Sequence, residues 1–222
     1  GPNDTTTTNG YDPRGWLNQT TDPAGKTWQT DHNEEGVMVS ETTPQGFVTS
    51  YSLDSLGNTT AIVDPLGHAT TYVYDEMNRV TAVTDPLGRT TAYDYDGRGL
   101  LTGVTLPDGT AATYEYDERG LLATIHAPEG HDWAFTHTSM GQLQNRTDPL
   151  GNQWEYDYNQ RGLLTQVVYP TGDTQARTYD AVGNLTRQQY SIGPDLHYTY
   201  DDLNRLVATD GVSLTYNAEG QV

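Results

Sequence analysis

Regularly spaced aspartates are the residues of this 222-residue chain that could do acid–base chemistry. A glycosidase needs two carboxylates roughly 5 to 9.5 Å apart. Here, however, each aspartate of the recurring set is followed three residues later by Gly or Asn, which is the pattern of a turn. We therefore expect these side chains to cap backbone N–H groups rather than to catalyse a reaction. The set is Asp12, Asp22, Asp64, Asp75, Asp85, Asp96, Asp117, Asp148, Asp180 and Asp201.

The other residues that could do chemistry lack the spacing of known catalytic or metal sites. His126, His131 and His137 are five and six residues apart, unlike the ligands of known zinc signatures. Stacked turn carboxylates are an alternative calcium site, but the glycine–aspartate pattern of calcium-binding solenoids is missing. The sequence contains neither a nucleophile elbow nor a phosphate loop, and it has no cysteine. We expect no enzyme, no metal and no cofactor.

Tyrosines recur in pairs two residues apart, which places both rings on one face of a strand. Trp28, Trp133 and Trp154 extend this row by one step. We expect the rings of successive units to form cross-strand aromatic ladders. Aromatic faces also bind sugars, so a cell-surface adhesin or carbohydrate-binding module is the alternative function. The pairs are Tyr72 and Tyr74, Tyr93 and Tyr95, Tyr114 and Tyr116, Tyr156 and Tyr158, and Tyr198 and Tyr200.

A repeat of 21 residues sets these spacings. The motif Tyr-Asp-x-x-Gly, or a degenerate copy, starts at Tyr11 and recurs every 21 residues to Tyr200, and a last copy starts at Tyr216. Its fifth residue is always Gly or Asn, the residues that accept a positive φ most readily. A second motif, Asp-Pro-Leu-Gly or a variant, lies in the middle of each unit and always ends in Gly, from Gly25 to Gly193.

Both motifs predict a type I turn followed by a left-handed residue, which closes a β-hairpin with a bulge. In Asp85-Pro86-Leu87-Gly88, Asp, Pro and Gly take their preferred places in such a turn. We expect an all-β fold, with tandem 21-residue antiparallel β-hairpin repeats forming a curved meandering sheet of about twenty strands. Gly15, Asn78, Gly88 and Asn204 should have positive φ. The motif residues are Tyr74, Asp75, Asp85, Pro86, Gly88, Tyr93, Tyr95, Asp96, Gly99, Tyr114, Tyr116, Asp117, Gly120, Tyr156, Tyr158, Gly162, Tyr198 and Tyr200.

The strand that follows each Tyr-Asp motif is less clear. One apolar row includes Val80 and Leu101, and a second includes Val83 and Val104, three residues further on. An odd spacing puts the two rows on opposite faces of a regular strand. Either both faces are partly apolar, or a bulge resets the register.

Charge limits the partners. The formal net charge of -19 disfavours nucleic acid and anionic membrane surfaces, both of which attract basic proteins. No apolar run reaches the roughly 18 residues that span a bilayer. Gly1-Pro2 looks like a protease scar, so we expect residues 1–10 to be a tag remnant and polar leader, and residues 11–222 to be the repeat array.

Two stretches of the repeat resemble a known family. Residues 116–122, Tyr-Asp-Glu-Arg-Gly-Leu-Leu, are similar to the YD repeat of bacterial Rhs proteins, and residues 85–96 are similar to the Rhs consensus. His32, Leu53 and His137 depart from it at the leading tyrosine. The resemblance implies a β-cocoon wall like those of toxin-complex subunits and teneurin YD shells. It implies a secreted or cell-surface bacterial protein whose partners are further repeats and an enclosed C-terminal toxin.

The length of the array sets a limit on enclosure. Twenty strands at about 4.8 Å give a sheet about 95 Å long, which closes into a ring about 30 Å across. A folded domain of about 100 residues is roughly 34 Å wide and does not fit. We therefore expect an open, curved strip that needs further repeats. Its bare outer strands invite edge-to-edge self-association, which the negative charge opposes.

Overall fold

The computed structural model describes residues 6–217 and 219–221. In this part of the chain it contains 21 β-strands and one short 3-10 turn, η1 (Pro128–Gly130), so the predicted all-β fold is confirmed. The described residues include no helix that is long and apolar enough to cross a membrane. The chain divides into two units, Gly1–Ala111 and Ala112–Val222.

The strands are short and evenly spaced. The first unit holds β1 (Thr8–Tyr11), β2 (Leu17–Thr21), β3 (Thr27–His32), β4 (Met38–Thr42), β5 (Val48–Leu53), β6 (Thr59–Val63), β7 (Ala69–Tyr74), β8 (Val80–Thr84), β9 (Thr90–Tyr95) and β10 (Leu101–Thr105). The second holds β11 (Ala111–Tyr116), β12 (Leu122–Ala127), β13 (His131–His137), β14 (Leu143–Thr147), β15 (Gln153–Tyr158), β16 (Leu164–Val168), β17 (Thr174–Tyr179), β18 (Leu185–Tyr190), β19 (Asp195–Tyr200), β20 (Leu206–Thr209) and β21 (Val212–Ser213).

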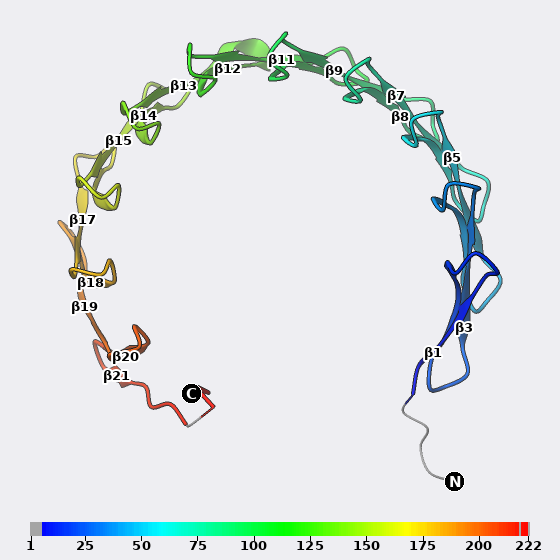
Figure 1. Ribbon diagram of the computed structural model, residues 1–222. Helices are drawn as coiled ribbons and strands as arrows, with labels where there is room; N and C mark the ends of the chain where they lie inside the picture. Colours follow the sequence, from blue (N-terminus) through cyan, green and yellow to red (C-terminus); the bar gives the residue numbers. More distant parts are fainter. Residues whose placement is uncertain (1–5, 218, 222) are drawn as a thin grey trace. The chain divides into compact units, whose positions relative to one another are not determined.

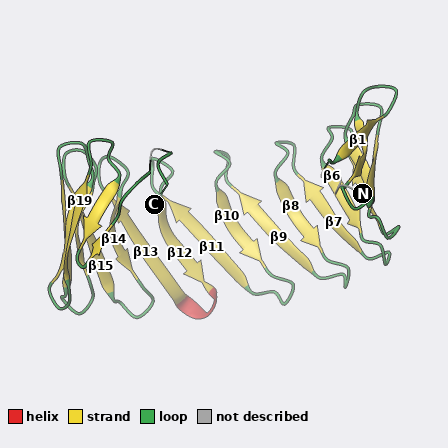
Figure 2. Ribbon diagram, turned by 90° about the horizontal axis from the view of Figure 1, so that it is seen from below, coloured by secondary structure: helices red, strands yellow, loops and turns green. Residues whose placement is uncertain are grey.

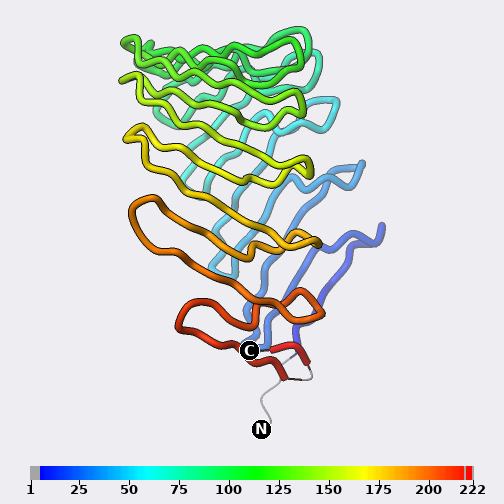
Figure 3. The backbone as a smooth tube through the Cα atoms, turned by 90° about the vertical axis from the view of Figure 1, so that its left-hand side faces the viewer, coloured from blue at the N-terminus to red at the C-terminus, as the bar shows by residue number. Residues whose placement is uncertain are grey.

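Each strand of a unit is antiparallel to the next strand in the sequence, from β1 to β10 and again from β11 to β21. Within each unit the sheet bends along the direction in which the strands follow one another (Figure 1). The hairpins lie side by side, and their turns alternate between two edges (Figures 2 and 3). The expected sequential hairpin order is confirmed.

Two edges follow from this alternation. The Tyr-Asp edge carries the turns that open at Asp12, Asn33, Asp54, Asp75, Asp96, Asp117, Thr138, Asn159, Asp180, Asp201 and Asn217. The Asp-Pro edge carries the turns that open at Asp22, Thr43, Asp64, Asp85, Leu106, Ala127, Asp148, Tyr169 and Tyr190. The left-handed turn residues behave as predicted: φ is 90° at Gly15, 59° at Asn78, 76° at Gly88 and 60° at Asn204.

A bulge settles the question of the two apolar rows. In the β7–β8 hairpin, Tyr74 pairs with Val80 and Val73 with Ala82, so Thr81 is skipped and Tyr72 pairs with Val83. Val80 and Val83 therefore share one face with the two tyrosines. A register shift occurs at the Tyr-Asp end of ten hairpins, whereas the hairpins closed by Asp-Pro turns from Asp22 to Tyr190 show regular pairing in the described ladders.

Each unit is a single layer. Because no second layer covers either face, most side chains on the aromatic face are half-buried rather than buried. The most buried side chains of the described residues are Val167 and Gln175, which are 6% and 5% exposed. Stability must therefore come from contacts between neighbouring strands and turns, as in other repeat proteins.

Candidate functional site: two turn edges, an aromatic face and a cleft

Asp75 shows how a Tyr-Asp turn is held. Its Oδ1 accepts hydrogen bonds from the backbone N–H groups of Met77 and Arg79, at 2.9 and 3.0 Å. Its Oδ2 lies 2.6 Å from a guanidinium nitrogen of Arg79. The side-chain bond from Arg79, followed by the backbone bonds, lowers the pKa of Asp75 below its usual 3.8. The carboxylate is committed to the turn, so it is poorly suited to act as a proton donor.

Capping of this kind occurs in all eleven turns of the Tyr-Asp edge. Asp12, Asn33, Asp54, Asp75, Asp96, Asp117, Thr138, Asn159, Asp180, Asp201 and Asn217 each accept a hydrogen bond from the backbone N–H four residues on. The aspartates that the sequence singles out on this edge therefore lie in turns.

Turns of successive repeats contact one another along the Tyr-Asp edge. Arg79 donates to the backbone oxygen of Asp96 at 3.2 Å, and Arg119 and Arg161 reach Thr138 and Asp180 in the same way. The motif glycine leaves room for this neighbour: a Cβ on Gly36 would lie 2.7 Å from the Trp16 ring. Here glycine is needed for its small size as well as for its positive φ.

The tyrosine that opens the Tyr-Asp motif bonds the backbone of the preceding strand in several repeats. The β8–β9 ladder covers only residues 82–84 and 90–92, so the strands part toward the Tyr-Asp edge. The Tyr95 hydroxyl crosses this gap and donates to the backbone oxygen of Val80 at 3.0 Å. The same bond links Tyr74 to Thr59, Tyr158 to Leu143 and Tyr179 to Leu164.

The expected aromatic ladders do not form. Among the described residues, the two rings that lie close enough to interact are those of Trp16 and His32, whose centroids are 6.0 Å apart. The physical reason is that each repeat contributes two strands, so equivalent tyrosines stand about 9.6 Å apart, beyond the 4.5 to 7 Å of ring pairs. Strand β8 lies between the tyrosine-bearing strands β7 and β9. Its Val83 pairs with Tyr72 of β7 and with Thr91 of β9.

The remaining motif residues take equivalent places. Tyr93, Tyr114, Tyr116, Tyr156, Tyr198 and Tyr200 are half-buried in their strands, as are Tyr74, Tyr95 and Tyr158. Asp96 and Asp117 open turns, and Gly99, Gly120 and Gly162 follow them with φ of 89°, 83° and 78°. The structure thus distributes these residues over the repeats, and it does not gather them into one pocket.

The Asp-Pro edge is held less uniformly. The Asp85 carboxylate accepts backbone bonds from Leu87 and Arg89, Pro86 follows Asp85 in the turn, and Gly88 has open space around it. Asp22, Thr43, Asp64 and Asp148 also cap their turns. In the other four turns, Leu106, Ala127, Tyr169 and Tyr190 occupy the opening position, and their side chains have no carboxylate, amide or hydroxyl placed to do the same.

The histidines behave as ordinary sheet residues. His126 contacts Asp132 at 2.9 Å, and this hydrogen bond raises the pKa of the imidazole, with a smaller contribution from Glu115. Within the described residues, no group of three or more His, Cys, Asp or Glu side chains is arranged to hold a metal ion.

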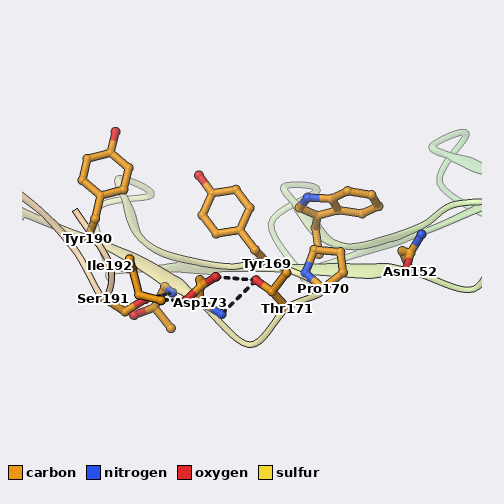
Figure 4. Close-up of a pocket in the computed structure, with 10 residues that line it drawn as sticks. Asn152, Tyr169, Pro170, Thr171, Asp173, Tyr190, Ser191 and Ile192 are labelled. Carbon is orange, nitrogen blue, oxygen red and sulfur yellow. Dashed lines mark hydrogen bonds between the residues drawn. The ribbon is translucent and has the colours of Figure 1, made fainter. Parts of the chain in front are cut away.

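A cleft at the Asp-Pro edge of the second unit escaped the sequence analysis. It has a volume of about 550 Å³ and lies between the turns that open at Tyr169 and Tyr190. The rings of Tyr169, Tyr190 and Trp154 line it, and Asp173 and neighbouring hydroxyls form its polar side (Figure 4). The available signal was the replacement of aspartate by tyrosine at two successive turn openings, Tyr169 and Tyr190.

Polar side chains contact the aromatic rings on this face of the second unit. The guanidinium of Arg146 lies 4.0 Å from the Trp154 ring and 5.5 Å from the Trp133 ring, and its Nε is buried without a hydrogen-bond partner. Gln175 donates to the Tyr190 hydroxyl at 2.9 Å and accepts a long bond of 3.5 Å from the Tyr169 hydroxyl. This network distinguishes the second unit's face from the Val and Tyr rows of β7 to β9.

Known proteins share this arrangement. The model of the teneurin YD-shell matches residues 67–190, and the model of the Rhs repeat matches residues 32–68 and 179–213. No curated protein matches the chain.

Solved structures show a similar fold. TcdB2-TccC3, alone and with Cdc42, superposes with a TM-score of 0.55 at 16% identity over 91% of this chain. The Tc holotoxin pore of Photorhabdus luminescens gives a TM-score of 0.50 at 17% identity, again over 91% of this chain. This chain covers only 15% to 16% of the length of those chains.

Proposed function

Since this chain belongs to the YD-shell family of teneurin and Rhs repeats, we propose that it is a stretch of shell wall that encloses and shields a C-terminal toxin within a larger secreted protein. A single observation carries the proposal: the structure is a one-layer sheet of hairpin repeats whose Tyr-Asp turns contact those of the next repeat. Such a sheet covers a large area with few residues, which suits a wall.

The functional residues are then the motif residues, acting structurally. Tyrosine hydroxyls close the gaps between strands, turn carboxylates hold the turns, and the glycines admit the neighbouring turn. These roles need no catalytic group. We propose that the partners are the remaining repeats of the parent protein and the toxin domain, and that bacteria secrete the assembly or display it on their surface.

Enclosure requires more wall than this chain supplies. A ring made from 21 strands would be about 30 Å across its backbone, and inward-facing side chains would leave a lumen about 20 Å wide. This lumen is too narrow for a folded domain of about 100 residues. Small-angle scattering of this chain in dilute solution should give an open strip, monomeric at low concentration. A closed hollow particle made by one chain would contradict this expectation.

Protease protection in the parent protein tests enclosure directly. The toxin domain should resist a protease that digests it readily when it is expressed alone. Deleting residues 85–105, one complete 21-residue unit, shortens the wall while keeping every other repeat in register. Substituting Leu87→Ser in the same unit is the control, since that side chain is 77% exposed. A toxin domain digested equally fast in the intact parent and in isolation would refute the enclosure.

A further inference from the structure

The cleft between the turns opening at Tyr169 and Tyr190 is built from residues that the turn itself does not require. The turn at Tyr169 keeps its backbone bonds, from Tyr169 N–H to Asp173 at 2.8 Å and from Gly172 N–H to Tyr169 at 2.8 Å. In four other turns an aspartate in the opening position also caps the N–H four residues on. At Tyr169 the Thr171 hydroxyl accepts that N–H, from Asp173, at 3.3 Å, and at Tyr190 the residue four on is Pro194, which has no N–H. The two tyrosines are therefore free of a capping role, and they create an aromatic wall.

The rings rise from one side of the sheet and stand next to one another. Figure 4 shows Tyr169 and Tyr190 upright on the same side, with their hydroxyls directed away from the ribbon. Both hydroxyls bond the side chain of Gln175, which is 5% exposed and restrains their positions. The wall is thus held in place before any ligand arrives, which reduces the entropy lost on binding.

The Tyr190 hydroxyl keeps its own proton for a ligand. It accepts bonds from the amides of Gln175 and Gln188. Because neither bond uses the proton of the phenol, the hydroxyl can still donate to a ligand oxygen. The cleft therefore offers a fixed donor beside an apolar ring.

Asp173 supplies the complementary acceptor. Its carboxylate receives the hydroxyls of Thr171 at 2.6 Å and Ser191 at 3.2 Å. A carboxylate has about four lone-pair positions, so Asp173 retains capacity for donors from a ligand. Ser191 also accepts the backbone N–H of Thr174 at 2.8 Å, which joins the two turns at the base of the cleft.

We propose that this cleft binds an uncharged hexopyranose unit of a glycan. A pyranose ring presents a face of C–H bonds to aromatic rings, and each of its hydroxyls both donates and accepts, which matches Tyr190 and Asp173. Asp173 and the net charge of -19 oppose an anionic sugar. A proline-rich peptide would suit the rings, but proline has no N–H to donate to Asp173.

A corresponding cleft in the first unit provides the comparison. It lies between the turns that open at Asp85 and Leu106 and has a similar volume of about 580 Å³. Val83, Arg89 and Pro107 line it, and no aromatic ring is among its lining residues in the described chain. The proposed sugar site is therefore specific to the repeats in which tyrosine replaces aspartate.

Titration of the full 222-residue chain with a panel of methyl hexopyranosides, followed by calorimetry and saturation-transfer NMR, tests the proposal. A ligand of about a dozen non-hydrogen atoms should bind with a Kd on the order of 1 mM. Tyr190→Phe removes the outward donor but keeps the ring, and Asp173→Asn removes the charged acceptor. Each should weaken binding by about tenfold.

Ile192→Ser keeps the test decisive if either of those variants fails to fold. Ile192 lines the cleft and is 80% exposed, so its replacement spares the fold while it removes an apolar contact and weakens binding. Leu87→Ser changes the equivalent turn residue beside the first unit's cleft and should leave sugar binding unchanged.

Three results would overturn the assignment. They are no binding of any glycoside at tens of millimolar, an equal loss in Leu87→Ser and Ile192→Ser, and binding of a polyproline peptide in place of the sugars. These outcomes are separate from protease protection of the toxin domain, so failure of the sugar site leaves the proposed wall function standing.

Discussion

On the Tyr-Asp edge, every described turn opens with a side chain that bonds the turn backbone, whereas Leu106, Ala127, Tyr169 and Tyr190 open four turns of the Asp-Pro edge. Some of the glycines differ in the same direction. Gly36 and Gly183 on the first edge face neighbouring side chains within 3 Å of a potential Cβ, although Gly15 and Gly57 do not, whereas Gly88 and Gly151 on the second edge face open space.

This difference indicates that the two edges of a repeat have different structural roles. The Tyr-Asp edge joins successive repeats through Arg and Gln side chains, so a change there disturbs two turns. Apart from the Ser191 bonds that join the turns at Tyr169 and Tyr190, the Asp-Pro edge closes each hairpin locally, so a change there mostly disturbs one turn. Tolerance of substitution on the second edge fits the loss of the opening cap residue at Leu106, Ala127, Tyr169 and Tyr190, and the two more voluminous clefts between adjacent turns lie on that edge.

Alanine at the motif glycines should give the largest difference between the edges. Gly88→Ala adds left-handed strain alone, about 1 to 2 kcal/mol of unfolding free energy. Gly36→Ala adds the same strain and a collision with Trp16 at 2.7 Å, for about 2 to 4 kcal/mol in total. Urea unfolding of both variants measures the difference. Equal losses would show that the neighbouring turn makes no use of the glycine.

Changes to the capping residues should affect the unfolding free energy less. Removing a cap on the Tyr-Asp edge should lower it, and adding an acceptor on the Asp-Pro edge should raise it. Asn159 accepts the backbone N–H groups of Arg161 and Leu163 at 2.9 and 3.0 Å, and Asn159→Ala should cost about 1 kcal/mol. Leu106→Asp supplies an acceptor at the opening position. Because the Asp108 carboxylate already accepts the Thr110 N–H at 2.9 Å, the variant should add only about 0.5 kcal/mol or less. Thermal melting of the two variants and a double variant checks the signs. A destabilising Leu106→Asp would show that the Asp-Pro turn has no use for the cap.

Removal of the tyrosine hydroxyl should locate the weak point of the sheet. Tyr95→Phe loses the bond to the Val80 oxygen where the strands part, at a cost of about 1 kcal/mol. Tyr93→Phe is the matched control, since no described residue receives a bond from the Tyr93 hydroxyl, and it should change stability by less than about 0.5 kcal/mol. If the two variants melt alike, the hydroxyl bond contributes nothing to the Tyr-Asp edge.

Local features were predictable from the sequence because each turn is encoded by four or five consecutive residues. Asp85 to Gly88 specify a turn and its positive φ without reference to any other strand, and the turn residues follow that expectation. Relations between strands were not predictable in this way. The bulge at Thr81 decides which face Val83 occupies, and the interposed β8 separates Tyr72 from Tyr93, so the expected ring stacking gave way to contacts between Tyr and Val.

The cleft was hidden for a related reason. Trp154, Tyr169 and Tyr190 belong to three different strands or turns. They meet because residues 155–157 pair with 166–168, residues 166–168 pair with 174–176, and Gln175 pairs with Tyr190. A repeat alignment shows the two tyrosines as departures from the pattern, but it does not show that they share a wall. The buried Gln175 that holds both hydroxyls gave no signal of its own.

Acid should loosen the carboxylate-capped turns before the tyrosine-opened ones. The pKa of Asp96 is lowered mainly by the backbone bond from Leu100, because that bond favours the charged form. A group with a depressed folded pKa contributes its full stability above the unfolded value, near 3.8, and loses it as the pH falls through the folded value. The capped turns should therefore weaken as the pH falls below about 4.

Amide hydrogen exchange at individual turns is the measurement that resolves this smallest effect. The Gly99 N–H bonds to the Asp96 carbonyl on the Tyr-Asp edge, and the Gly172 N–H bonds to the Tyr169 carbonyl on the Asp-Pro edge. Protection at Gly99 should fall more steeply with acid than protection at Gly172, whose turn opens without a carboxylate. Asp96→Asn should remove most of the pH dependence at Gly99, because its amide oxygen still accepts the turn N–H groups but does not titrate. Parallel loss of protection at both glycines would mean that acid opens the sheet as a whole, and that the two edges are not held independently.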